Sequence, residues 1–187
     1  IPPARRRREG TRHEASTHAR HHRRREHARA GRNGGDGALR HPRAVSGLDE
    51  LSEGRFRRIL PDATVEPASA KRLLLCNGKI YYDLLAEREK LGRGDVAIMR
   101  LEQLYPLKWS DFKAALMPYR QGTPLVWVQE EPANMGAWHF IRPHIEPVIG
   151  QPLTYVGRKA SASPATGFPL IYKTEQNAIT DQAVGPL

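Results

Sequence analysis

The sequence predicts an α/β fold in which a mainly parallel sheet carries helices on both faces. From residue 71 onward, short continuous apolar runs alternate with longer segments whose apolar residues recur at helical spacing. The runs also end at turn residues, as KRLLLCNG (71–78) ends at Asn77-Gly78. A continuous apolar run is typical of a strand that is buried on both faces. Strands that alternate with helices along the chain form parallel sheets.

Four strands are expected near residues 72–76, 95–100, 124–129 and 153–157. The helical patterns cover residues 79–91, 109–119, 133–149 and 173–184. The third helix is expected to be broken, because Pro143 and Pro147 each remove a helical hydrogen bond. Upstream, the pattern predicts a helical turn at Leu48–Leu51, an extended piece through residues 56–60 and a linker over residues 63–70.

The positive charge is concentrated at the start of the chain. The whole sequence has a formal charge of +10, and residues 1–43 hold 13 arginines, no lysine and four acidic residues. Residues 44–187 hold 17 basic and 16 acidic residues, so the predicted domain is nearly neutral. A nucleic-acid-binding fold needs a cationic face. We therefore expect neither nucleic acid nor a membrane as a partner.

Residues 1–36 are expected to be a disordered Arg/His-rich segment, and residues 37–187 a single domain. The segment contains no aromatic residue and, after Ile1, no large aliphatic one, so it cannot bury enough surface to fold. Two other interpretations stay open: an Arg/His arm that binds phosphate or metal, and a GC-rich gene translated in the wrong frame. No histidine spacing there defines a metal site.

The cysteine content and the hydropathy of the chain constrain the cellular compartment that is expected for the protein. The single cysteine, Cys76, excludes an intramolecular disulfide and is typical of a reducing compartment. It lies inside an apolar run, so a buried inert thiol is the expectation. No apolar stretch is long enough to span a bilayer, and the first 30 residues lack the apolar region of a secretory signal.

Three short segments contain residue types that could bind a ligand or take part in catalysis. Asn77-Gly78-Lys79 could place a phosphate at a helix start, although a tight strand-to-helix turn explains it as well. Glu130-Glu131 ends a strand, where neighbouring side chains point to opposite faces, so a catalytic pair is not expected. The loop from Gly157 to Pro164 combines two cations, two serines and small residues, and is the best candidate for a small ligand. No catalytic residue and no metal ligand are predicted.

Five longer segments carry a recognisable pattern: RLEQLYPL (100–107), WVQEEPANMGAW (127–138), YVGRKASASPATG (155–167), LLLCNGKIYYDL (73–84) and LRHPRAVSGLDEL (39–51). Together they resemble the C-terminal region of the thiamine-diphosphate-dependent first component of 2-oxoglutarate dehydrogenase. The resemblance covers about residues 38–184 in continuous order. Upstream of Ala38 it stops, which favours a frame error or a truncation there.

The resemblance implies a domain like the C-terminal domain of transketolase. It also implies membership of a homodimer that decarboxylates 2-oxoglutarate and passes succinyl to a lipoyl group on the second component, in the tricarboxylic acid cycle. Thiamine diphosphate and magnesium belong to earlier domains in this family, so no cofactor-binding residue is expected here. The implied location is the bacterial cytoplasm, or the mitochondrial matrix of a eukaryote, with the bacterial one favoured.

The family also implies an effector, acetyl-CoA or AMP, near the junction with the preceding domain. The residues expected near that surface are Lys79, Arg100, Arg158 and Ser161. We likewise expect the loop 158–167 to lie at a domain or subunit junction. Two rival functions remain: an independent α/β regulatory module that binds a nucleotide or coenzyme A, and a nucleic-acid-binding protein that uses the arginine-rich segment.

Overall fold

The computed structural model describes residues 41–186. The chain divides into two units between Phe56 and Arg57. The expectation of disorder over residues 1–36 lies outside the described residues. The described part of the first unit contains helix α3 (Leu48–Ser52), where the sequence predicts a helical turn, and the Gly47 amide donates to the Glu50 carboxylate at its start (3.3 Å).

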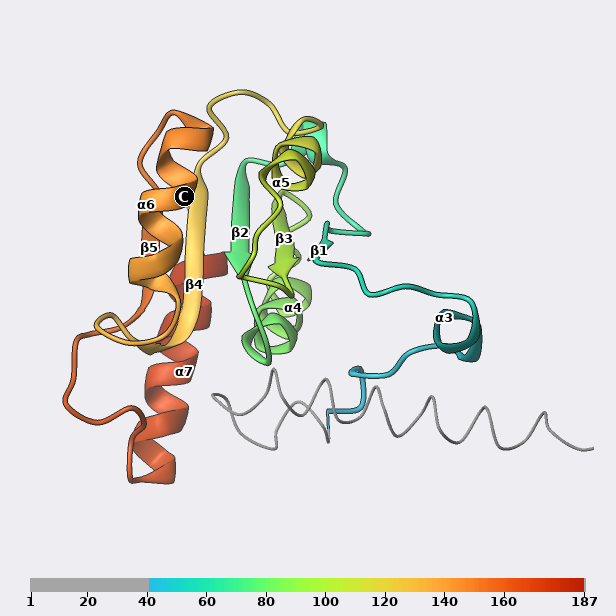
Figure 1. The fold of residues 1–187 in the computed structure, drawn as a ribbon. Helices are drawn as coiled ribbons and strands as arrows, with labels where there is room; N and C mark the ends of the chain where they lie inside the picture. The colour runs from blue at the N-terminus through green and yellow to red at the C-terminus, as the bar shows by residue number, and fades with distance from the viewer. Residues whose placement is uncertain (1–40, 187) are drawn as a thin grey trace, which may run out of the picture. The chain divides into compact units, whose positions relative to one another are not determined.

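The second unit is built around a five-stranded sheet with the strand order β1-β3-β2-β4-β5 (Figure 1). The strands β2, β3, β4 and β5 run parallel, and β1 pairs antiparallel with β3 at one edge. In chain order the elements are β1 (Ile59–Leu60), the 3-10 helix η2 (Pro67–Ser69), β2 (Arg72–Cys76), α4 (Ile80–Lys90), β3 (Val96–Leu101), α5 (Trp109–Leu116), β4 (Leu125–Pro132), α6 (Trp138–Ile149), β5 (Thr154–Arg158) and α7 (Pro169–Val184).

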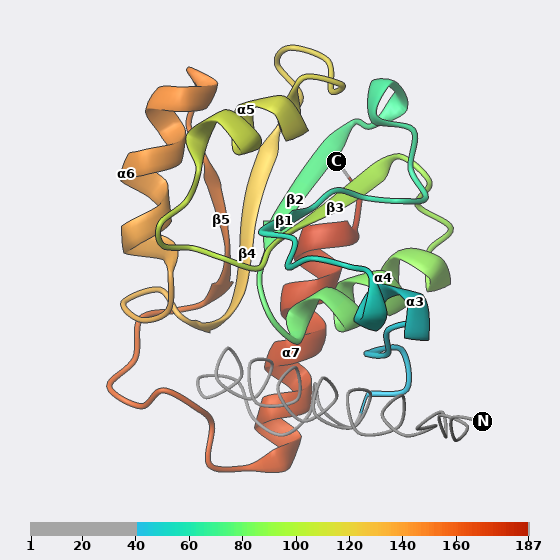
Figure 2. The same cartoon turned by 45° about the vertical axis from the view of Figure 1, so that its right-hand side comes forward.

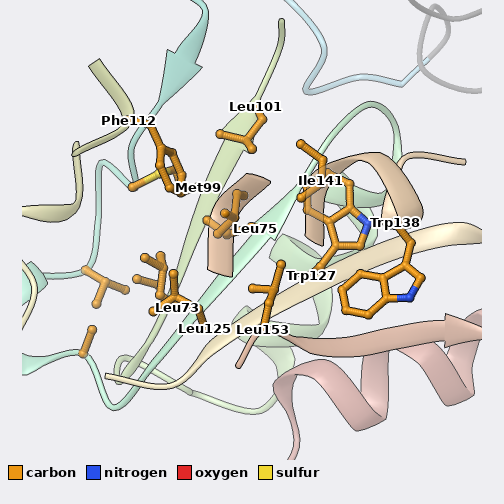
Figure 3. Packing of buried hydrophobic residues seen from close by; sticks show 14 residues of the cluster. Leu73, Leu75, Met99, Leu101, Phe112, Leu125, Trp127, Trp138, Ile141 and Leu153 are labelled. Atoms are coloured by element: carbon orange, nitrogen blue, oxygen red, sulfur yellow. The ribbon is translucent and has the colours of Figure 1, made fainter. Parts of the chain in front are cut away.

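Each face of the sheet carries its own apolar core. Alternate residues of β2 point to opposite faces, as Leu73 and Leu75 pack with α5 and α6 whereas Leu74 and Cys76 pack with α4 and α7. The helices therefore cover the two faces in pairs (Figure 2). Figure 3 shows the core under α5 and α6, where Trp127 and Met99 are fully buried. The α/β class with a mainly parallel sheet is confirmed.

The four parallel strands lie where the sequence predicts them, within two residues at each end except for β4, which continues to Pro132. The prediction of a broken third helix is wrong, because α6 is one helix through both Pro143 and Pro147. Its buried side chains are Trp138, Ile141 and Ile145. Burial of such side chains contributes about 1.5–3 kcal/mol each, which is comparable to the cost of about 3 kcal/mol for an interior proline.

Residues 63–70 are more than the predicted linker. They contain η2, and Val65 and Ala70 enter the core with 6% and 5% of their surface exposed. The extended piece before them forms β1, in which Ile59 pairs with Leu101. This antiparallel strand joins the segment that follows the first unit to the edge of the sheet.

Candidate functional site at the carboxyl edge of the sheet

The charged residues singled out from the sequence lie at the carboxyl ends of the parallel strands. Lys79 follows β2, Arg100 lies in the last residues of β3, and Arg158 ends β5. Parallel strands end at one edge of the sheet, and α/β proteins bind ligands outside that edge. This carboxyl edge is therefore the candidate functional site.

Lys79 precedes α4, and its ammonium group is surrounded by oxygen atoms. Nζ lies 3.0 Å from Oδ2 of Asp83, 3.2 Å from Oε1 of Glu130 and 3.1 Å from the Tyr172 hydroxyl. That hydroxyl donates in turn to Oε2 of Glu130 (3.3 Å). The contacts join the start of α4, the end of β4 and the first half of α7.

The electrostatics of this cluster keep the lysine charged. Burial lowers the pKa of Lys79, but Glu130, the Tyr172 hydroxyl and Asp83 outweigh burial and hold that pKa above its ordinary value. Burial raises the pKa of Glu130, and the Lys79 ammonium offsets this only in part. An anionic ligand at Lys79 would therefore compete with two carboxylates already in place.

Arg158 belongs to the same cluster. Its Nε donates to Glu175 (2.8 Å), its Nη1 to the Glu130 carbonyl (2.6 Å) and its Nη2 to the Gln176 side chain (3.2 Å). Only 9% of the Arg158 side chain is exposed. Because Lys79 and Arg158 both bind Glu130, the structure brings these two predicted residues together and uses both to attach α7 to the sheet edge.

The other two predicted residues lie in separate surroundings. The Arg100 guanidinium lies 4.2 Å from the centre of the Tyr81 ring and 3.3 Å from the Glu102 carboxylate. Ser161 is exposed on the loop after β5, where its backbone exchanges two hydrogen bonds with the Asn134 side chain (2.9 and 3.0 Å). The four residues thus form one paired cluster and two separate sites.

Gln129 organises the loop after β4, although the sequence analysis did not single it out. It is 1% exposed, and its Oε1 accepts hydrogen bonds from Nε1 of Trp127 (2.8 Å) and from the backbone amide of Trp138 (3.0 Å). Its Nε2 donates to three backbone carbonyls, those of Glu131 (3.2 Å), Pro132 (3.3 Å) and Met135 (2.8 Å). A glutamine inside a strand carries no sequence signal for such a role.

Gly136 permits the loop to close over Gln129. Its φ is +66°, and an added Cβ would lie 2.8 Å from Nε2 of Gln129. We expect Gly136→Ala to lower the free energy of unfolding by about 1–2 kcal/mol because of the left-handed backbone alone. The close contact of the added Cβ with Gln129 should lower it further. Gly122→Ala is the matched control, because Gly122 has φ +83° with nothing within 4 Å of the added Cβ. Urea titrations that show equal losses for both variants would contradict the contact contribution.

Cys76 and the tryptophans lie in apolar surroundings. Cys76 is fully buried, and burial raises the pKa of its thiol. Trp127 is also fully buried, Trp138 is 9% exposed, and Trp109 packs against the same core. These positions agree with a buried thiol and with tryptophans that serve packing.

Over residues 41–186, no helix combines the length and apolar character needed to cross a bilayer. Within the same range, no three His, Cys, Asp or Glu side chains gather as metal ligands would.

Comparison of the sequence with known proteins shows which family the chain belongs to. Among curated proteins, the chain is 45% identical over 149 residues to the 2-oxoglutarate dehydrogenase E1 component of Haemophilus influenzae, and 40% identical over 151 residues to that of Azotobacter vinelandii. Each match covers 78% of this chain and 16% of the relative. The chain therefore spans about a sixth of the length of the curated relatives it matches.

A third relative, the 2-oxoglutarate dehydrogenase E1 component of Brucella ovis, is 43% identical over 164 residues, which are 79% of this chain and 16% of the relative. The family model described as 2-oxoglutarate dehydrogenase C-terminal matches residues 45–184, the same part of the chain that carries the sheet and its helices. The chain therefore belongs to the 2-oxoglutarate dehydrogenase C-terminal family.

Proposed function

We propose that the chain serves as the C-terminal interface domain of a 2-oxoglutarate dehydrogenase first component. In that role it supports an enzyme that decarboxylates 2-oxoglutarate and passes succinyl to the lipoyl group of the second component. The family match, and relatives in which the match covers only 16% of the length, support the proposal. They do not favour an independent regulatory module.

The observation that carries the interface role is the exposed apolar start of α7. Phe168, Leu170 and Ile171 have 69%, 77% and 48% of their surface exposed within four consecutive residues. Exposed large apolar side chains that cluster in this way mark surfaces that bind other proteins or domains. They directly follow the loop 158–167, for which a junction is predicted. We propose that this end of α7 packs against the rest of the enzyme or its dimer partner.

Thiamine diphosphate and magnesium, which the family implies for the whole enzyme, do not fit the carboxyl edge of the sheet in the described residues 41–186. Magnesium prefers carboxylate and other oxygen ligands. At the carboxyl edge, Glu130 and Asp83 already bind Lys79, and Glu175 binds Arg158. We therefore place the cofactor in the remainder of the enzyme and assign no catalytic step to this domain.

The effector role stays part of the proposal. Acetyl-CoA or AMP would use Lys79, Arg100, Arg158 and Ser161 as predicted, and its phosphates would replace the acidic partners of the first three. A bacterial cytoplasmic location follows from the same proposal, since the relatives named above come from bacteria.

The purified 187-residue chain is expected to show no turnover of 2-oxoglutarate with thiamine diphosphate and magnesium, because we place the cofactor site in the remainder of the enzyme. A chimera tests the interface role: residues 45–184 replace the matching segment of the Haemophilus influenzae relative. We expect the chimera to dimerise and to decarboxylate 2-oxoglutarate. Phe168→Ser combined with Leu170→Ser should abolish dimerisation or turnover.

Met117→Ser in the same chimera is the matched control, because Met117 is 81% exposed at the end of α5, away from α7 in the sequence. Sedimentation velocity measures dimerisation, and a decarboxylation assay measures turnover of 2-oxoglutarate. Turnover by the chain alone, or full assembly and turnover of the doubly substituted chimera, would refute the proposal.

A further inference from the structure

A pocket of about 450 Å³ lies between the loop that follows β5 and the outer side of α7. Figure 1 shows this loop leaving the sheet edge and returning to the start of α7. The Asn134 side chain holds the loop through its two hydrogen bonds to the Ser161 backbone, and the Ser163 hydroxyl donates to the Ala165 carbonyl (2.7 Å). The volume is within the range of small-molecule sites.

Two polar groups of the pocket lack partners within the described part of the chain. The Thr166 hydroxyl oxygen is buried and has no hydrogen-bond partner there. A buried hydroxyl without a partner costs free energy, which a ligand oxygen would recover. The Lys159 ammonium has neither an ion pair nor a hydrogen bond among the residues described, although Lys159 lines the same pocket.

The charge of the pocket lining leaves one cation in excess. Arg158 lines the pocket but is neutralised by Glu175, whose carboxylate lies 2.8 Å from its Nε. Lys159 is the remaining charge. A ligand with a single negative charge would therefore be matched, whereas a phosphate dianion would face one free cation and the Glu175 carboxylate.

The rest of the lining is largely apolar. Pro132 contributes from the end of β4, Pro164 from the loop after β5, and Ala178 and Ile179 from α7. An apolar floor beside one free ammonium and one free hydroxyl suits a molecule with an apolar body and a carboxylate at one end. We infer that this pocket binds a small monocarboxylate. The inference goes beyond the interface role, because it concerns a site formed by this chain alone.

The test is a titration of the full 187-residue chain with hexanoate, hexanamide and inorganic phosphate, followed by NMR of backbone amides and of the Ala178 and Ile179 methyl groups. We expect hexanoate to shift the signals of residues 159–166 and of both methyl groups. It should bind about tenfold more tightly than hexanamide, since only the carboxylate makes a charged hydrogen bond. Inorganic phosphate should bind more weakly than hexanoate, because it must first displace Glu175 from Arg158.

Two variants locate the site. Lys159→Met should weaken hexanoate binding about tenfold and leave hexanamide binding unchanged, whereas Lys173→Met, an exposed lysine of α7 outside the lining, should leave both unchanged. Ala178→Trp fills the pocket and should abolish both. Equal affinity for hexanoate and hexanamide, tighter binding of phosphate, shifts confined to other residues, or no binding would each overturn the inference.

Discussion

Arg88→Met is expected to lower the free energy of unfolding by about 3–5 kcal/mol, because it leaves a carboxylate buried without its counter-charge. The Arg88 side chain in α4 is 8% exposed and the Asp62 side chain 3%, and the two form an ion pair. Arg88 also donates to the Val96 carbonyl (3.1 Å) and the Thr64 hydroxyl (2.7 Å). Urea denaturation followed by circular dichroism measures the loss.

The large expected loss of stability reflects the number of backbone groups that the Asp62 carboxylate binds. Its carboxylate accepts hydrogen bonds from the backbone amides of Thr64 (2.8 Å), Val65 (3.1 Å) and Ile98 (2.7 Å). Asp62 thus fixes the segment after β1 to the neighbouring strand β3. Without Arg88, these amides and the Thr64 hydroxyl (2.8 Å) must hold a buried negative charge that has no counter-ion.

Two companion variants separate the charge from the packing. Lys90→Met removes an exposed cation from the same helix, and it should leave the free energy of unfolding nearly unchanged. The double variant Asp62→Asn, Arg88→Met should be more stable than Arg88→Met, because no charge is then buried without a partner. A double variant that is less stable than Arg88→Met would contradict this explanation.

The same carboxylate makes stability depend on pH. Burial raises the pKa of Asp62, but the hydrogen bonds from Thr64, Ile98 and Arg88 outweigh it, so the pKa lies below its ordinary value in the folded protein. In the unfolded chain an aspartate binds its proton near pH 4. The stabilisation is therefore present above about pH 4 and is lost as the pH falls through the folded pKa. The stability gap between wild type and Asp62→Asn should narrow below about pH 4.

The parallel strands were predictable because each is a short apolar run, which is typical of strands that are buried on both faces of a sheet. Leu73 to Cys76 read as one apolar run, and both faces of β2 are indeed covered by helices. The family was predictable because several motifs occur in continuous order. Both signals are local, and neither requires knowledge of which distant segments touch.

Long-range polar contacts were not predictable in this way. Asp62 lies between the predicted extended piece and the predicted linker, and its amide partner Ile98 is 36 residues away. The continuity of α6 through Pro143 and Pro147 also depends on packing against the sheet, which overrides the local proline rule. Among the predicted effector residues, Lys79 and Arg158 share a cluster because both bind Glu130 at the end of β4, which is far from Lys79 in the sequence.

Gln129→Leu is the second substitution with a large expected effect, about 3–5 kcal/mol, because it removes one side chain from five hydrogen bonds. Leucine matches the glutamine in size but satisfies neither the indole of Trp127 nor the amide of Trp138. Thermal and urea denaturation measure the loss. Gln121→Leu, at an exposed glutamine before β4, is the control and should change little.

Gln129→Glu distinguishes the hydrogen-bond role from simple packing. A carboxylate at this position could still accept from Trp127 and Trp138, but its second oxygen would face the carbonyls of Glu131, Pro132 and Met135. Burial and those carbonyls should raise its pKa, so the folded state keeps the proton to a higher pH than the unfolded chain does. Stability relative to wild type should therefore be greatest near pH 4 and fall as the pH rises toward 8. A loss that is independent of pH would show that the carbonyls after β4 do not depend on the donor that Gln129 supplies.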